Sequence, residues 1–310
     1  MSVVGDVRGV CRWLAEQDPG LVVAVMCAEH PDAATWSRDG PQRGIDVIYR
    51  FETCLTHIPA APIVDFIASG VGHLTVLLDG CAEPNRSATV VAQWAELLEA
   101  AGRRGVIAQQ IDAPLPSTSG RWRRRRECPV YAASSVPTSR RRLLGLAGDS
   151  WPEPSTYPHE RTAHALRRLL AGRPTPTGLH ALSSGVPDLR ATGCIGSGVC
   201  VRTCPQDALD LHTQATPEGE RFTLTVDPHQ CMDCTDCVDI CPQAALKVTG
   251  ERSWGELVDN DDLVVAQGPV LRCRQCRAPF AGAGTLCEVC TFRRSNPFGS
   301  WRPPRRDLSD

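Results

Sequence analysis

The chain has 310 residues, enough for two or three compact domains, and its 42% hydrophobic and 22% charged content excludes wholesale disorder and a collagen-like structure. The net charge is −2, but it is unevenly spread: −5 over residues 1–110, +7 over 111–190 and −4 over 191–310. Sixteen cysteines indicate either a disulfide framework or thiolates that bind metals.

The N-terminal segment favours the metal interpretation. The first twenty residues contain acidic side chains and no sustained apolar run, so they do not resemble a secretory signal. No stretch approaches the roughly 20 apolar residues that cross a bilayer. We therefore expect a cytoplasmic protein whose cysteines bind metals, with no membrane span.

The front region, residues 1–112, alternates two kinds of apolar run. Runs rich in β-branched residues predict buried strands at 21–27, 45–51, 73–80 and 105–111. Runs with helical period lie at 62–70 and 88–104. Because alternating strands and helices form a parallel sheet with crossover helices, the sequence predicts an α/β domain here.

Residues 113–192 read as a basic connecting segment rich in Pro and Arg. They include the charge run RWRRRR at 121–126 and short predicted helices at 139–148 and 159–172. A linker that wraps over neighbouring domains is the favoured interpretation, and a docking surface for an acidic partner is the alternative. Nucleic acid is disfavoured as a partner because no series of stacking aromatic residues accompanies the arginines.

The back half contains an internal repeat. Residues 194–209 align without gaps onto residues 231–246, an offset of 37, and the intervening segment predicts a hairpin that turns at 217–219. The second copy reads Cys231-x2-Cys234-x2-Cys237-x3-Cys241-Pro242. This spacing is typical of iron–sulfur ligands, and residues 193–250 resemble the bacterial-type two-cluster 4Fe–4S ferredoxin module, an α+β fold.

The resemblance implies two ligand sets. A 4Fe–4S cluster would be held by Cys204, Cys231, Cys234 and Cys237. A second cluster would be held by Cys194, Ser197, Cys200 and Cys241, with serine where the family has cysteine. The alternatives for this second site are a labile 4Fe–4S cluster, a 3Fe–4S cluster or an empty site. We favour the first two, because three thiolates are retained.

The two motifs also differ in charge. The second contains Asp233, Asp236 and Asp239, whereas the first contains glycines and an arginine. Negative charge disfavours reduction, so we predict a lower potential for the cluster of the second motif. The alternative is that solvent screens these carboxylates.

A third cysteine pattern lies within residues 251–294. Its ligands, Cys273, Cys276, Cys287 and Cys290, form two Cys-x2-Cys pairs that suit tetrahedral coordination, and the segment resembles a small zinc ribbon. A rubredoxin-type single iron is the alternative, but the Cys-Pro and Cys-Gly pairs of rubredoxins are missing. Residues 295–310 are expected to be a disordered tail.

The front region holds further candidate ligands. A mixed metal site, such as a 2Fe–2S centre, is suggested by residues that follow predicted strands: Cys27, His30, Cys54, His57 and Cys81. The stretch 50–81 also resembles the small iron–sulfur (delta) subunits of hydrogenase and heterodisulfide-reductase complexes. The alternative is that these cysteines are buried as small apolar side chains, as we expect for Cys11 and Cys128.

No phosphate-binding glycine loop, serine-nucleophile elbow or metalloprotease helix occurs, so independent catalysis is not indicated. The favoured function is an electron-transfer component that relays single electrons to or from a larger redox enzyme. A redox- or iron-responsive regulator with a labile cluster and a basic binding segment is the alternative.

Overall fold

The structure is a computed structural model that divides into two compact units. The α/β unit comprises residues 1–184 and 253–259, and the cysteine-rich unit comprises residues 185–252 and 260–310. The described residues are 7–28, 30, 45–78, 81–110, 128–137, 151, 155–217, 219–260, 262–280 and 284–299. The basic run at 121–126, the helix expected at 139–148 and residues 300–310 lie outside them.

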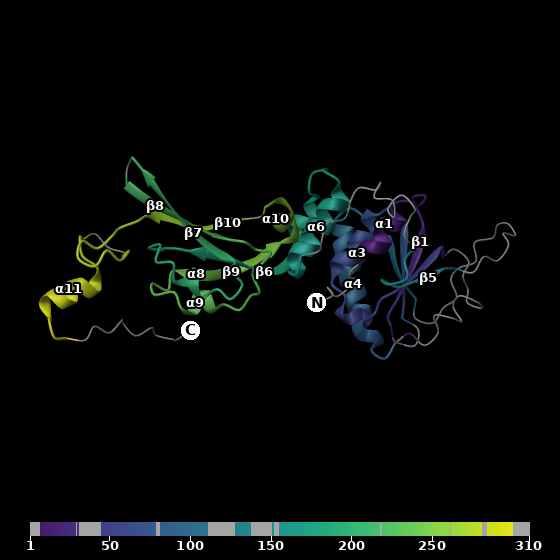
Figure 1. Ribbon diagram of the computed structural model, residues 1–310, viewed down its shortest axis with the longest axis horizontal. Helices are drawn as coiled ribbons and strands as arrows, with labels where there is room; N and C mark the ends of the chain where they lie inside the picture. The colour runs from purple at the N-terminus through teal and green to yellow at the C-terminus, as the bar shows by residue number, and fades with distance from the viewer. Residues whose placement is uncertain are drawn as a thin grey trace. The chain divides into compact units, whose positions relative to one another are not determined.

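The α/β unit is built on a five-stranded sheet in the order β4-β3-β1-β2-β5, with every neighbouring pair parallel (Figure 1). The register aligns Val23 with both Val47 and Leu74. The strands are β1 (Val22–Met26), β2 (Val47–Arg50), β3 (His73–Leu77), β4 (Ile107–Gln110) and β5 (Val130–Tyr131). The predicted parallel-sheet α/β region is therefore confirmed.

Helices cover one face of this sheet in Figure 1. They contribute apolar side chains to one core cluster with the strands, among them Phe66 and Trp94, which are 0% and 3% exposed. Burying side chains of this size stabilises the fold by about 1.5–3 kcal/mol each. The elements are α1 (Arg8–Leu14), η1 (Leu55–His57), α3 (Ala60–Ala68), α4 (Pro84–Ala100), α7 (Thr177–Ala181) and α10 (Trp254–Asp259).

The segment that the sequence interprets as a connection contributes directly to the α/β unit. Its β5 extends the sheet beside β2, where Ile48 N–H donates to the Pro129 carbonyl at 2.9 Å. Its helix α6 (Pro158–Leu170) packs on α3, and Arg168 of α6 binds Asp65 of α3 at 2.7 Å. Amphipathic spacing explains the packing, because Leu166 and Leu169 share one buried face.

The cysteine-rich unit is built on two small sheets. Strands β7 (Leu209–Thr216) and β8 (Gly219–Val226) form the predicted antiparallel hairpin, and β10 (Leu263–Pro269) pairs with β8. Strands β6 (Ser183–Ala191) and β9 (Leu246–Ser253) form the second sheet. The helices are α8 (Val199–Thr203), α9 (Asp236–Asp239) and α11 (Glu288–Ser295).

No helix in the described ranges combines the length and the apolar character that crossing a membrane requires.

Candidate iron–sulfur and metal sites

The sequence repeat is reproduced in the backbone. Helices α8 and α9 begin at residues 199 and 236, which are equivalent under the 37-residue offset. Six residues adopt the left-handed region in three equivalent pairs: Gly196 with Asp233, Gly198 with Thr235, and Asp207 with Ala244. The loops that precede and follow each helix therefore share these left-handed turns, although their side chains differ.

Proline explains how one short helix serves two sites. Cys200 lies within α8, and Cys204 follows its last residue with an extended backbone, φ −64° and ψ 116°. The residue before a proline avoids the helical region, so Pro205 ends the helix at this point. The thiols of Cys200 and Cys204 consequently line different cavities instead of sharing one helix face.

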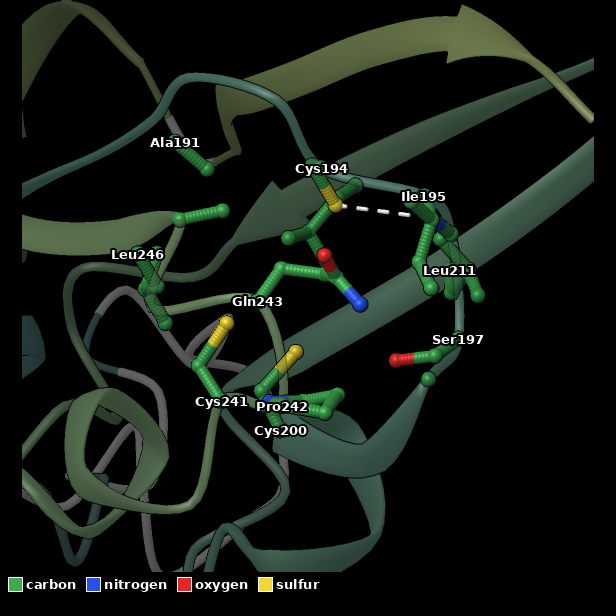
Figure 2. A pocket seen from close by; sticks show the side chains of 14 residues that line it. Ala191, Cys194, Ile195, Ser197, Cys200, Leu211, Cys241, Pro242, Gln243 and Leu246 are labelled. Carbon is green, nitrogen blue, oxygen red and sulfur yellow. Dashed lines mark hydrogen bonds between the residues drawn. The ribbon is translucent and has the colours of Figure 1, made fainter. Parts of the chain in front are cut away.

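The first cavity is lined by all four side chains predicted for the second cluster. Figure 2 shows the Ser197 hydroxyl pointing into it from one side, with the sulfur atoms of Cys200 and Cys241 opposite and that of Cys194 above. The Gly196 N–H donates to Cys194 Sγ at 3.5 Å. Ser197 therefore faces the same cavity as the three cysteines with which the resemblance groups it.

The second cavity is lined by Cys204, Cys231, Cys234 and Cys237. Ala208 N–H donates to Cys204 Sγ at 3.3 Å. Cys234 is exposed, whereas the other three cysteines are partly buried. This is the ligand set that the resemblance implies for the 4Fe–4S cluster.

The electrostatics of both cavities suit a cationic iron core. Burial, followed by the charge of neighbouring thiolates, raises the pKa of Cys237 to about 12. Burial also raises the pKa values of Cys194, Cys200 and Cys231. Such thiols stay protonated until metal displaces the protons, so iron binding and deprotonation are coupled. Backbone N–H groups directed at the sulfur atoms fit the same chemistry.

Two glutamines were missed as site residues. Gln206 lines the second cavity and Gln243 the first, and Figure 2 shows the Gln243 amide directed into the cavity. Each follows a Cys-Pro pair at the same repeat position. The repeated Cys-Pro-Gln sequence is the signal that identifies them.

The third cysteine group has a different geometry. The sulfur atoms of Cys273, Cys276, Cys287 and Cys290 all lie within 4.8 Å of one another, the only such ligand group in the described ranges. Cys276 Sγ and Cys287 Sγ are 3.7 Å apart. A tetrahedron with metal–sulfur bonds of about 2.3 Å has edges of about 3.8 Å. The spacing therefore suits a single ion, whereas the cysteines that line each of the two cavities above do not form so tight a group in the described ranges.

The two cysteine pairs of this group are presented differently. Arg277 adopts φ 64° after the first pair and its N–H donates to the Cys273 carbonyl, which closes a tight turn. The second pair lies at the start of α11, where Cys290 N–H donates to Cys287 Sγ at 3.4 Å. Hydrogen bonds from the backbone, first that of Cys276, lower the pKa of Cys273 to about 6, while burial raises the pKa of Cys290 to about 12.

The front-region candidates follow strands but are not gathered into one tight group. Cys27 directly follows β1 and is buried, Cys54 precedes η1, and Cys81 lies between β3 and α4. Cys54 Sγ accepts from Thr56 Oγ1 at 3.2 Å, and Cys81 Sγ lies 3.4 Å from Ser87 Oγ. In the part of the chain that the structure describes, neither these cysteines nor His30 and His57 belong to a group of three ligand atoms within 4.8 Å.

Known sequences agree with the interpretation of the repeat. Residues 193–245 match the family model of the 4Fe-4S dicluster domain. The chain is 38% identical over 60 residues to the polyferredoxin protein MvhB of Methanothermus fervidus, which is 19% of this chain and 14% of that protein. The resemblance to two-cluster ferredoxin modules is thereby confirmed.

Two further relatives carry similar segments. One subunit of the Na(+)-translocating ferredoxin:NAD(+) oxidoreductase complex of Acetobacterium woodii is 34% identical over 59 residues, 19% of this chain and 16% of its own. NADH-quinone oxidoreductase subunit I 2 of Geobacter metallireducens is 32% identical over 85 residues, 26% of this chain and 63% of its own. In each case the chain spans less than two thirds of the relative's length.

Proposed function

We propose that the protein is an iron–sulfur electron-transfer component of a larger redox complex. The observation that carries the proposal is the pair of thiol-lined cavities joined by two short backbone spans. Cys200 in α8 lines the first cavity, and Cys204 at the end of α8 lines the second. Cys237 in α9 lines the second cavity, and Cys241, just after α9, lines the first. Two clusters linked in this way would exchange single electrons over a short path.

In this proposal Cys204, Cys231, Cys234 and Cys237 bind a 4Fe–4S cluster. Cys194, Ser197, Cys200 and Cys241 bind the second cluster, either a labile 4Fe–4S or a 3Fe–4S. When bound, the clusters supply one-electron carriers. The chain holds them with thiolates and N–H···S hydrogen bonds and restricts water with the apolar residues Leu211, Leu224 and Leu246.

The second cavity is the better candidate for electron exchange with a partner. Its Cys234 is exposed, and two lining side chains, Met232 and Val248, are 58% and 44% exposed. Large apolar side chains exposed beside a redox centre favour contact with another protein. The names of two relatives describe them as subunits of oxidoreductases, and we infer that this chain also serves a larger redox enzyme subunit.

We further propose that Cys273, Cys276, Cys287 and Cys290 bind structural zinc, as in a zinc ribbon. Four thiolates leave no open coordination position, and three of them are buried. The segment is fastened to β8 by Arg272, which binds both carboxylate oxygens of Glu220 at 2.8 and 3.0 Å. A 2Fe–2S centre in the front region, near Cys27, Cys54 and Cys81, is a separate proposal.

Anaerobic purification with quantified iron, sulfide and zinc, combined with EPR, tests these assignments. Two four-iron clusters and the zinc site predict about eight irons and one zinc; a three-iron cluster lowers the iron to about seven. About two additional irons would support the front-region centre. Protein that binds no iron and sulfide after reconstitution would contradict the electron-transfer proposal.

A reciprocal exchange provides matched variants. Ser197→Cys should convert a three-iron or labile site into a stable 4Fe–4S cluster. Cys234→Ser, at the equivalent repeat position, should make the site in the second cavity behave like the site in the first cavity. If both variants leave iron content and EPR spectra unchanged, the ligand assignment at these positions is wrong.

A further inference from the structure

The side-chain hydroxyl of Ser197 is the weakest iron donor of the four groups proposed for its site. It points into the cavity whose other donors are three cysteine sulfur atoms (Figure 2). Iron of a sulfide cluster prefers soft thiolate to a hard oxygen donor. Ser197, Cys194 and Cys200 are each partly exposed, so a small solute can reach the position beside the Ser197 hydroxyl from solvent.

The charged side chain beside the loop that contains Ser197 is Arg202, which is positive. Gly198 directly follows Ser197 in the chain. Arg202 Nη1 lies 3.4 Å from the point that a Cβ on Gly198 would occupy. In the described part of the chain Arg202 forms no ion pair. The equivalent position of the second repeat is Asp239, so the complete ligand set has a negative charge where the incomplete one has a positive charge.

The cavity wall adds no opposing charge. The side chains that line the first cavity include no Asp or Glu among the described residues, whereas Asp233 lines the second. A ligand that carries negative charge therefore meets less repulsion from side chains at the first site than at the second.

We propose that the iron beside Ser197 keeps an exchangeable position that binds a small thiol bearing an anionic group. The inference rests on the proposed function, since it requires a four-iron cluster in the first cavity. With a cluster held by Cys194, Cys200 and Cys241, an incoming thiol would replace the Ser197 oxygen as the fourth donor and would leave its proton on that oxygen. No electron is transferred, and Arg202 attracts the anionic group of the incoming thiol.

The test is an anaerobic titration of the full-length protein, reconstituted with iron and sulfide, followed by EPR of the reduced cluster and visible absorption. The probes are mercaptoacetate, which carries a carboxylate, and 2-mercaptoethanol, which does not. We expect a saturable spectral change with both thiols in the wild-type protein and none in Ser197→Cys, whose position is already filled by thiolate.

Arg202→Gln should weaken mercaptoacetate binding about threefold, as expected for an exposed charge, and leave 2-mercaptoethanol binding unchanged. Asp239→Asn is the matched control at the equivalent position and should alter neither titration. Equal weakening of both thiols in Arg202→Gln would contradict the role of its charge.

Iron analysis before the titration distinguishes failure of the proposed electron-transfer function from failure of the proposed thiol-binding position. Protein that binds no iron and sulfide would overturn the proposed function, and the exchangeable position with it, whereas iron for the second cavity alone would overturn the exchangeable position and leave electron transfer standing. Protein that contains a second cluster but shows no thiol-dependent spectral change, or a three-iron signal that added ferrous ion does not convert, would overturn the exchangeable position alone.

Discussion

Thr235, between Cys234 and helix α9, allows the backbone strain of the loop in the second cysteine motif to be measured. It has φ 59° at the start of α9, although β-branched residues rarely adopt the left-handed region. That conformation costs an L-residue about 1–2 kcal/mol. The Thr235 side chain makes no capping hydrogen bond that its removal would lose. A glycine at an otherwise ordinary position costs about 0.5–1 kcal/mol in chain entropy. Thr235→Gly should therefore stabilise the folded protein by about 0.5–1 kcal/mol.

The assay is the rate at which cluster absorbance disappears in anaerobic denaturant. We expect Thr235→Gly to slow this loss about two- to fivefold, because stabilising interactions usually slow unfolding. The reciprocal change, Gly198→Thr, should accelerate it: the backbone has φ 68° and the new Cβ would lie 3.3 Å from Leu211 Cδ2. Faster or unchanged loss in Thr235→Gly would refute the assignment of strain to this residue.

Three further changes test other parts of the molecule. Replacing the three aspartates of the second cysteine motif by asparagine should raise the midpoint potential of the adjacent cluster; an unchanged midpoint in redox titration would indicate solvent screening. Asp65→Asn weakens the charge-assisted bond to Arg168 and should cost about 1 kcal/mol, seen as a lower melting temperature by circular dichroism. Cys290→Ser should abolish zinc binding while iron content stays constant; simultaneous loss of iron would show that the segment stabilises the cluster domain.

The sheet was predictable because its strands carry their own signal. The apolar β-branched runs are buried on both faces of a parallel sheet, so they stand out between helical segments. Strand β5 is different: two residues, Val130 and Tyr131, pair with β2 and give no local pattern. Likewise, α10 belongs to the α/β unit although it follows the cysteine repeat, a long-range association that no local propensity encodes.

The candidate sites were predictable to the extent that spacing determines geometry. Short intervals between cysteines within one loop, and the proline after the fourth, fix which thiols face one cavity. The sequence does not reveal that Arg202 approaches the loop containing Ser197, since helical packing decides where that side chain lies. Nor does spacing distinguish a second β-turn from the first turn of α11 as the support of Cys287 and Cys290.

The interleaving of the two units constrains how the protein can be dissected. The chain passes from one unit to the other after residues 184, 252 and 259, so the α/β unit encloses the cluster-bearing segment in sequence. Within the α/β unit, the Trp254 N–H donates to the Leu182 carbonyl at 2.9 Å. A protease that cuts one crossing would leave the fragments attached under native conditions. Expressing the first 184 residues alone would also remove α10, whose Val258 belongs to the apolar core.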